Sequence, residues 1–329
     1  MLRGPFLLLS LLLPLLMSLL LGGTARADCP PAAASPPPGQ VAALQAAASD
    51  HGVMWKVTRD GHVSWLYGSL HLGRLTWAFP GPSLMRAWGA TDVLALELDL
   101  ADPQTQGELL EAGKPDAEPI PAGLQKRLDA QILAACLPPE GLAAYHPLLR
   151  LSLLSALSAR RDGLDPAYGQ DAMLGGLAHA SGRPVVALET AKSQMEVLLG
   201  NDAKETREAL EEGLTLLEQD RVRAGVLKLA QAWAHGDLAT LASYEQWCDC
   251  VHTEADRRDL RRLNDDRNGP LAEHIAALHA SGKRVLAVVG ALHMTGDAAL
   301  PKLLAAQGFE VERVKMQQKP QQNNKETTP

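Results

Sequence analysis

The sequence predicts an α/β (α+β) protein with a central mixed β-sheet, built from two related halves, flanked by helices and interrupted by an all-helical insertion. Alternating apolar residues on both sides of Asp60-Gly61 indicate a β-hairpin. Short apolar runs that end in an acid or in a Gly-x-x-His loop alternate with helical segments, which is the pattern of a sheet covered by helices. Residues 192–264 show helical periodicity alone, which indicates the insertion.

Composition divides the 329 residues into four parts. Residues 1–27 predict a signal peptide, because a Leu-rich run follows a basic start and ends at a small-x-small site. An uncleaved anchor is the alternative, although the run falls short of the roughly 20 apolar residues that span a bilayer. Residues 28–50 are Pro/Ala-rich and predict an extended linker, 51–315 form the predicted domain, and 316–329 predict a disordered tail.

The expected protein is therefore exported and secreted or periplasmic, in the cell envelope, with no stable membrane span after signal cleavage. The formal net charge of −7 gives no reason to expect a nucleic-acid partner. An oxidising compartment would allow the four cysteines, at 29, 136, 248 and 250, to form disulfides. Their spacing leaves the pairing open, and no second ligand pair completes a zinc site around Cys248-Asp249-Cys250.

The first half of the domain is expected to begin with a hairpin from Val53 that leads directly into Gly68. A buried strand is expected over 92–99, and the Pro-, Gly- and acid-rich residues 102–121 predict a surface excursion. The predicted helices of this half span 83–88, 124–137, 147–160 and 169–180.

The second half begins with a predicted strand over 185–189, ended by an acid. The insertion 192–264 follows, with its longest helical stretch over 203–233, and is expected to cover the cleft as a lid. The elements after it are a helix over 271–280, a strand over 284–289, a helix ending at 307 and a strand over 309–314.

Two matching loops give the strongest functional signal. Gly68-Ser69-Leu70-His71 and Gly290-Ala291-Leu292-His293 each place a His just after a hydrophobic strand. Ligands of α/β sheets bind at strand ends, where a glycine allows a tight turn and a close approach to the backbone. A single Gly-x-x-His is usually an ordinary loop histidine, but the repeat at matched positions predicts one shared site for His71 and His293.

Acids end two further predicted strands. Glu97 follows the run from Val93, and Glu189 follows Val185 to Leu188. A carboxylate buried at such a position needs a cation, a metal or a proton. Together with the two imidazoles, these acids predict either a His-carboxylate metal site or a general acid/base pair. The alternatives are a surface acid for Glu97 and a helix-capping acid for Glu189.

At this point the chain resembles the TraB/GumN family. The matching blocks, in family order, are Tyr67–Gly73, Leu96-Glu97, Gly163–Asp165, Leu188–Thr190 with Gln194, Asp266–Asn268 and Gly290–Gly296. Each block is short, but their order and spacing are specific and span nearly the whole expected mature chain. The chain departs from the family pattern at Met294-Thr295 and after Asp165, which puts a role for Asp165 in doubt.

The resemblance implies a fold similar to the erythromycin esterase and ChaN-like group. The family includes the animal Tiki proteins, described as divalent-metal-dependent proteases, and bacterial members implicated in shutting down peptide pheromones. The resemblance therefore implies a divalent metal ion (Mn, Co or Zn), a peptide or protein substrate, and a site in which His71, Glu97 and His293 are both metal ligands and catalytic. Glu189 and Arg267 would support catalysis, and Tyr67, Ser69 and Asn268 would contact the substrate.

Arg267 and Asn268 have a simpler interpretation, an ion pair with Asp265 or Asp266 and a helix cap. For the whole chain, the main hypothesis is an exported hydrolase that cleaves peptide or amide bonds with a divalent metal. The alternative is a non-catalytic envelope protein that uses the same cleft to sequester a peptide, a metal or haem, since ligands and catalysts use the same side chains. A scaffold partner in envelope assembly is a third hypothesis.

Overall fold

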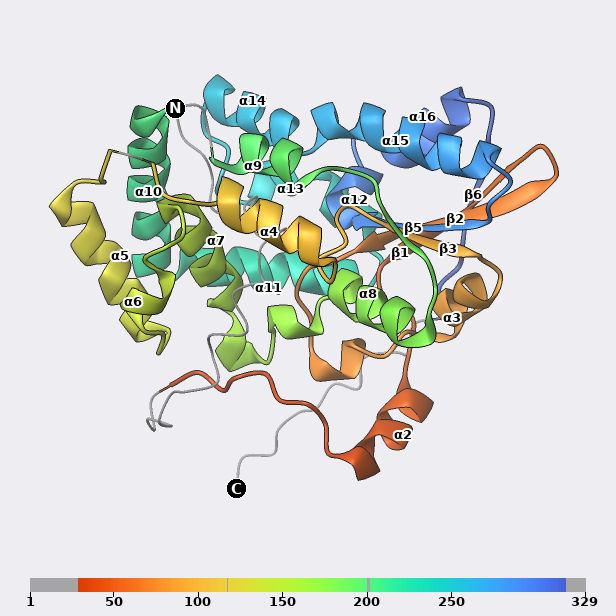
Figure 1. The fold of residues 1–329 in the computed structure, drawn as a ribbon, viewed down its shortest axis with the longest axis horizontal. Helices are drawn as coiled ribbons and strands as arrows, with labels where there is room; N and C mark the ends of the chain where they lie inside the picture. The colour runs from red at the N-terminus through yellow and green to blue at the C-terminus, as the bar shows by residue number, and fades with distance from the viewer. Residues whose placement is uncertain (1–28, 117, 200–201, 318–329) are drawn as a thin grey trace.

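The computed structural model describes residues 29–116, 118–199 and 202–317. The expected signal peptide and most of the expected tail lie outside these residues. Within them, six strands form one mixed sheet in the order β4-β3-β5-β2-β1-β6 (Figure 1). The strands are β1 Val53–Arg59, β2 His62–Ser69, β3 Val93–Leu96, β4 Val185–Ala187, β5 Val285–Gly290 and β6 Glu310–Arg313. The predicted mixed sheet flanked by helices is confirmed.

The predicted hairpin around Asp60-Gly61 is confirmed by the pairing of β1 with β2. Arg59 lies opposite His62, so the turn has two central residues, and both have left-handed backbones, with φ of 53° at Asp60 and 76° at Gly61. A two-residue turn of this kind matches the twist of the paired strands. The hairpin fixes the register of β2, and thereby the position of the loop that carries His71.

Four strands run parallel, so their carboxyl ends meet at one edge. β2 pairs in parallel with β5, β5 with β3, and β3 with β4. Every residue of β3 is buried, which fits a strand covered on both faces. The segments that leave these strands carry His71, Glu97, Glu189 and His293. The topology therefore brings the four predicted side chains to the same edge of the sheet.

Helices cover both faces of this sheet. Figure 1 shows α15 and α16 on one face and α3 and α8 on the other. The helices in the described residues are α2 Pro38–Ala47, α3 Pro82–Gly89, α4 Pro103–Ala112, α5 Ala122–Ala134, α6 Pro139–Leu142, α7 Pro147–Leu157, α8 Gln170–Ser181, α9 Ala191–Leu199, α10 Ala203–Glu218, α11 Arg221–Ala234, α12 Leu238–Ala242, α13 Tyr244–Trp247, α14 Glu254–Leu263, α15 Asp265–Ala280 and α16 Leu300–Ala306.

Three segments differ from the sequence expectation. The expected excursion contains α4, because the Asp102 carboxylate caps it by accepting from Thr105 N at 2.8 Å, and Pro103 suits a first helical turn. The stretch 203–233 is two helices, separated where Asp220 adopts a left-handed backbone with φ of 58°. The expected linker is extended only before α2, which begins at Pro38.

The described part of the insertion is helical, and it belongs to the main core. Val226 and Trp233 of α11 lie in the same buried cluster as the sheet residues Leu66 and Val288. The Trp233 indole Nε1 donates to Gly68 O at 2.8 Å, just before the first Gly-x-x-His loop turns. The insertion is therefore part of the support for this loop.

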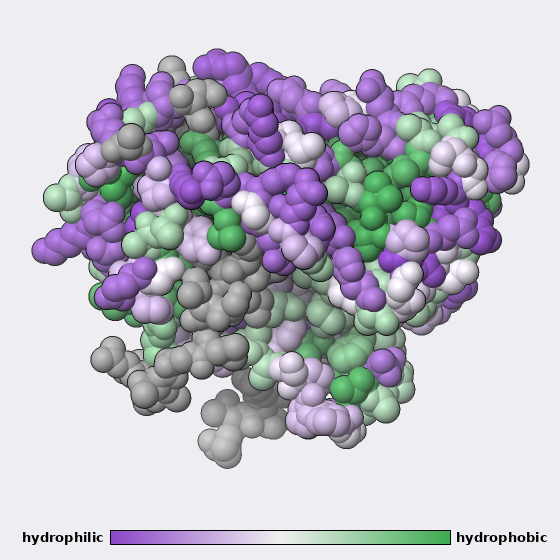
Figure 2. All heavy atoms as spheres, in the orientation of Figure 1, coloured by the Kyte–Doolittle hydropathy of each residue, from purple (hydrophilic) through white to green (hydrophobic). Residues whose placement is uncertain are grey.

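No helix in the described part of the chain is long and apolar enough to cross a bilayer. Figure 2 shows hydrophilic side chains over α14 and an area of hydrophobic surface between α15 and α8. In the edge strand β4, Val185 and Val186 are half-buried.

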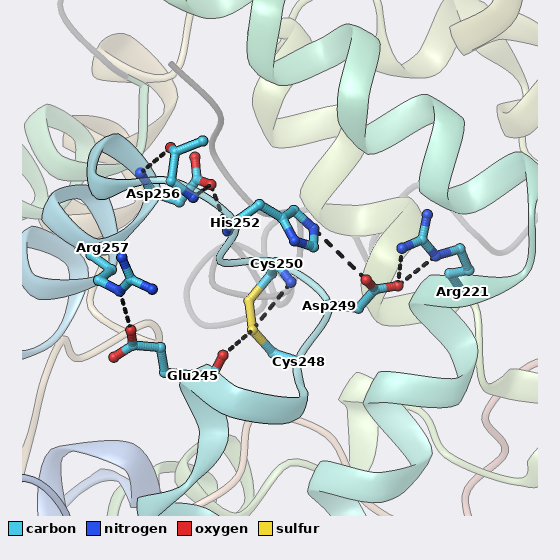
Figure 3. Close-up of a disulfide and its surroundings, with 9 residues drawn as sticks. Arg221, Glu245, Cys248, Asp249, Cys250, His252, Asp256 and Arg257 are labelled. Carbon is cyan, nitrogen blue, oxygen red and sulfur yellow. Dashed lines mark hydrogen bonds and ion pairs between the residues drawn. A yellow bond between two sulfur atoms is a disulfide. The ribbon is translucent and has the colours of Figure 1, made fainter.

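Disulfides join all four cysteines, which settles the pairing that the spacing leaves open. Cys29 pairs with Cys136, and Cys248 pairs with Cys250. Figure 3 shows the second bond closing the turn between α13 and α14, with the Asp249 side chain directed to Arg221. Asp249 has a left-handed backbone with φ of 56°. This disulfide thus fixes a local turn, whereas the first ties the amino-terminal segment to the region after α5.

The bond from Trp233 to Gly68 gives a stability test. Trp233→Phe removes this buried hydrogen bond to Gly68 O, so we expect the free energy of unfolding to fall by about 0.5–1.5 kcal/mol beyond the loss of ring volume. Trp65→Phe is the matched control, because the Trp65 indole N–H is buried without a partner among the described residues. Urea denaturation measures both. Equal losses in the two variants would contradict the assigned role of the bond.

Candidate functional site

His71 lies at the start of the loop after β2, with both ring nitrogens beside acids. Its Nδ1 lies 2.9 Å from Asp171 Oδ2, and its Nε2 lies 3.9 Å from Glu97 Oε1. The start of α8 holds this arrangement, because Gln170 N donates to Leu70 O at 3.0 Å. A Cβ at residue 169 would meet His71 O at 2.6 Å, so only glycine allows α8 to begin this close.

The charge of His71 depends on its neighbours. Burial disfavours the imidazolium, but the Asp171 carboxylate outweighs it, and the pKa of His71 is raised above its ordinary value. Asp171 Oδ2 is an ion-pair partner of Nδ1 but is not aligned to form a hydrogen bond with it, and Nε2 faces Glu97. A carboxylate on one ring nitrogen is the usual way in which proteins orient a ligating histidine.

Glu97 is the central acid of the site and is 5% exposed. Its Oε1 accepts from Gly290 N at 2.8 Å, and its Oε2 accepts from Arg267 Nη2 at 2.5 Å. Burial alone would raise the pKa of this carboxyl, but the Arg267 guanidinium, the two histidines and the Gly290 N–H together lower the pKa to about 2. Glu97 is therefore ionised at neutral pH.

His293 lies in a 3₁₀ turn, Ala291–Met294, after β5 and is also buried. Its Nδ1 lies 2.6 Å from Asn268 Oδ1, while Asn268 Nδ2 donates to Ala298 O at 2.9 Å. Since the amide oxygen faces the ring, Nδ1 is the nitrogen that carries the proton. Burial, and then the nearby Arg267, lower the pKa of His293 to about 3. His293 is therefore neutral, with Nε2 as its free acceptor.

Arg267 joins two of the acids. Its Nε donates to Glu189 Oε1 at 2.9 Å, and its Nη2 reaches both Glu189 Oε2 and Glu97 Oε2 at 2.5 Å. Gln194 Nε2 also donates to Glu189 Oε2, at 2.9 Å. Burial would lower the pKa of Arg267, but the Glu97 and Glu189 carboxylates raise it above its ordinary value. The simpler interpretation of Arg267 as a partner of Asp265 or Asp266 is wrong, and Asn268 lies inside α15 rather than at its cap.

Gly290 marks the point where the three principal residues converge. A Cβ built there would lie 3.4 Å from Glu97 Oε1 and 3.5 Å from both His71 Nε2 and the His293 ring carbon Cδ2. The structure therefore brings the two histidines of the sequence repeat together beside Glu97. Ser69, which pairs with Gly290 across β2 and β5, has a buried Oγ with no partner among the described residues.

The donor chemistry fits a divalent cation, although no three His, Cys, Asp or Glu side chains in residues 29–116, 118–199 and 202–317 already stand in a coordinating arrangement. Imidazole nitrogens and a carboxylate oxygen suit Mn, Co or Zn, and binding of such an ion would require His71 in its neutral form. Ligands of one such ion lie about 3–3.5 Å apart in tetrahedral geometry. The 3.9 Å between His71 Nε2 and Glu97 Oε1 requires only a small side-chain adjustment.

Two outcomes differ from the expected residue roles. The Tyr67 hydroxyl donates to His51 O at 3.0 Å and its ring is 1% exposed, so it packs in the core and does not contact the crevice. The sequence did not indicate Asp171 as a site residue. An acid in the first turn of a helix usually stabilises the helix by its favourable interaction with the helix dipole. The glycine just before this helix, Gly169, is the one signal of a close approach.

Comparison with known proteins places these residues in a family. A sequence model of the TraB/PrgY/gumN family matches residues 53–313. The chain belongs to this family. The matched span includes both Gly-x-x-His loops and every side chain described above.

Two curated members give a more distant comparison. Uncharacterized protein YbaP of Escherichia coli and the protein of the same name from Shigella flexneri are each 25% identical to this chain over 276 residues. The aligned region covers 76% of this chain and 96% of either relative. No solved structure shows significant similarity to the chain.

Arg267 gives the second test. Arg267→Leu leaves the buried Glu97 and Glu189 carboxylates without a cation, so we expect a loss of about 3–5 kcal/mol in unfolding free energy. The control is Arg284→Leu, which breaks an exposed pair with Asp92 and should cost far less. Denaturant unfolding of both variants decides the point, and similar small losses would show that the buried cluster contributes little.

Proposed function

We propose that this TraB/PrgY/gumN family member is a divalent-metal-dependent hydrolase that cleaves peptide or amide bonds. The observation that carries the proposal is the pair of imidazoles, one with Nδ1 paired with the Asp171 carboxylate and one with Nδ1 hydrogen-bonded to Asn268, at the edge where Glu97 is ionised. Histidines with a purely structural role do not require two imidazoles to lie beside the same carboxylate. In metal sites, a ligating histidine is usually oriented through its other ring nitrogen, which leaves Nε2 available to the metal.

His71, Glu97 and His293 would hold the ion, through nitrogens and a carboxylate oxygen that suit Mn, Co or Zn. A bound divalent ion supplies Lewis-acid polarisation of a carbonyl and lowers the pKa of bound water. The other residues of the site would position these ligands. Asp171 and Asn268 orient the two rings, while Gly290 N–H and Arg267 hold the Glu97 carboxylate.

Arg267 and Glu189 have supporting roles in this proposal. The guanidinium is engaged by two carboxylates and by Leu263 O, at 3.0 Å from Nη1. It therefore has little capacity left to bind a substrate carboxylate or an oxyanion, and acts as a positioning group for Glu97. Ser69 Oγ and Gln194 Oε1, both buried without a hydrogen-bond partner among the described residues, are two polar atoms available to a substrate or a water.

Export to the cell envelope is part of the proposal. Its support is the sequence of residues 1–27 together with the two disulfides, since disulfides persist in oxidising compartments. Non-catalytic sequestration of a peptide, metal or haem in the same cleft remains the competing hypothesis, and hydrolysis assays separate the two.

Metal binding is the first test of the proposal. We expect the purified mature chain to bind one equivalent of Mn, Co or Zn, and His71→Ala, Glu97→Ala and His293→Ala to bind none at comparable concentration. Asp171→Asn should keep the ligands but lose about 10- to 100-fold in affinity, because it loosens the His71 ring. Titration calorimetry and metal analysis measure this.

His235→Ala is the matched control, since this histidine is exposed and its Nδ1 is bonded to Gln231 O of its own helix. It should bind metal as the parent does. If the parent and the variants are all folded and free of metal after incubation with each ion, the metal-dependent proposal fails. Stoichiometric metal without hydrolysis of any peptide would instead favour sequestration.

A further inference from the structure

A narrow apolar slot lies beside the site, between α8 and the segment that follows β3. Its volume is about 130 Å³. We call it the leucine slot, and its lining includes Leu96, Leu98, Leu100, Gly175 and Gly176. A cavity of about 150 Å³ with aliphatic walls is large enough to hold benzene. The slot therefore has room for one aliphatic side chain.

Two consecutive glycines keep the slot open. A Cβ at residue 175 would lie 3.3 Å from Leu96 Cδ1, and a Cβ at residue 176 would meet nothing within 4 Å. Glycine inside a helix lowers the stability of the helix relative to alanine, so a pair of them in α8 needs another reason. A side chain at residue 175 would press on Leu96 at the wall of the slot, and a long side chain at residue 176, which also lines the slot, would compete for its space.

The slot is contiguous with the proposed metal centre. Asp171, which lies 2.9 Å from His71, also lines the slot, one helical turn before Gly175. Leu96 and Leu98 stand on either side of Glu97 in the chain. A substrate whose reacting carbonyl lies beside His71 and Glu97 therefore has a neighbouring side chain within reach of the slot.

The charges around the slot indicate which side chain it takes. Asp171 pairs with His71, and Asp99, another lining residue, lies 2.9 Å from His179 Nε2. Both carboxylates are thus engaged, and they would repel an acidic side chain. The rest of the lining is aliphatic or glycine, which favours burial of apolar groups without a charge.

We propose that the leucine slot binds one branched aliphatic side chain of the peptide substrate, at a residue next to the bond that is cleaved. This inference rests on the proposed function and adds its substrate preference. Glu97, His71 and His293 would act on the bond, and the slot would select the peptide by its side chain.

The test compares peptides that differ only at the residue beside the cleaved bond, which mass spectrometry of the digests identifies. The peptides carry Ala, Leu, Trp, Lys or Asp there, and kcat/KM is measured with the metal-loaded mature protein. We expect the Leu peptide to be preferred. Gly176→Leu should lower kcat/KM for the Leu peptide by about 10- to 100-fold, because it fills the slot, and should leave the Ala peptide nearly unchanged.

Gly123→Leu is the matched control, since it makes the same change at a helical glycine of α5 with open space around its Cβ. It should keep the parent's preference. If the parent cleaves with no preference, prefers Lys, or keeps its preference in Gly176→Leu, the slot inference is overturned while the hydrolase proposal stands. If no peptide is cleaved, or if cleavage survives His71→Ala, both are overturned.

Discussion

The buried guanidinium of Arg267 is the interaction on which the rest of the site depends. It joins carboxylates that follow β3 and β4 to a helix, α15, that lies between the insertion and β5. Two carboxylates in a low-dielectric interior are costly unless a cation meets them with good geometry. The next residue of the same helix, Asn268, orients His293. One turn of α15 therefore pairs the Glu97 and Glu189 carboxylates with a cation and also sets the orientation of the His293 ring.

Much of this architecture could be predicted from the sequence because it is written in local patterns. Asp60-Gly61 specifies a hairpin turn whichever residues lie beyond it. Glu97 and Glu189 each follow an apolar run in the sequence. These runs form the parallel strands β3 and β4, so both acids lie at the same edge of the sheet. The repeated Gly-x-x-His was informative for the same reason, since β2 and β5 are neighbours in the sheet. The side chains at these strand ends can be predicted from the local sequence once the strands are taken to be parallel.

Other features depend on tertiary contacts that a local pattern does not carry. Asp171 resembles any acid at the start of a helix until α8 is packed beside His71. Tyr67 belongs to a motif-bearing strand, but its hydroxyl is used by His51 O on the opposite side. The break at Asp220 has no Gly or Pro, so helical periodicity runs through it. For Asp171 and Tyr67 the deciding partner is distant in the chain.

The two disulfides join cysteines that are consecutive in the sequence, first with second and third with fourth. If the chain is exported amino-terminus first, as proposed above, this order matters. Cys29 would emerge first and find no partner until Cys136 follows, 107 residues later. Cys248 and Cys250 would emerge almost together, after the first pair. Oxidation in the order of emergence thus gives the native pairing directly, and such a chain has little need of a disulfide isomerase.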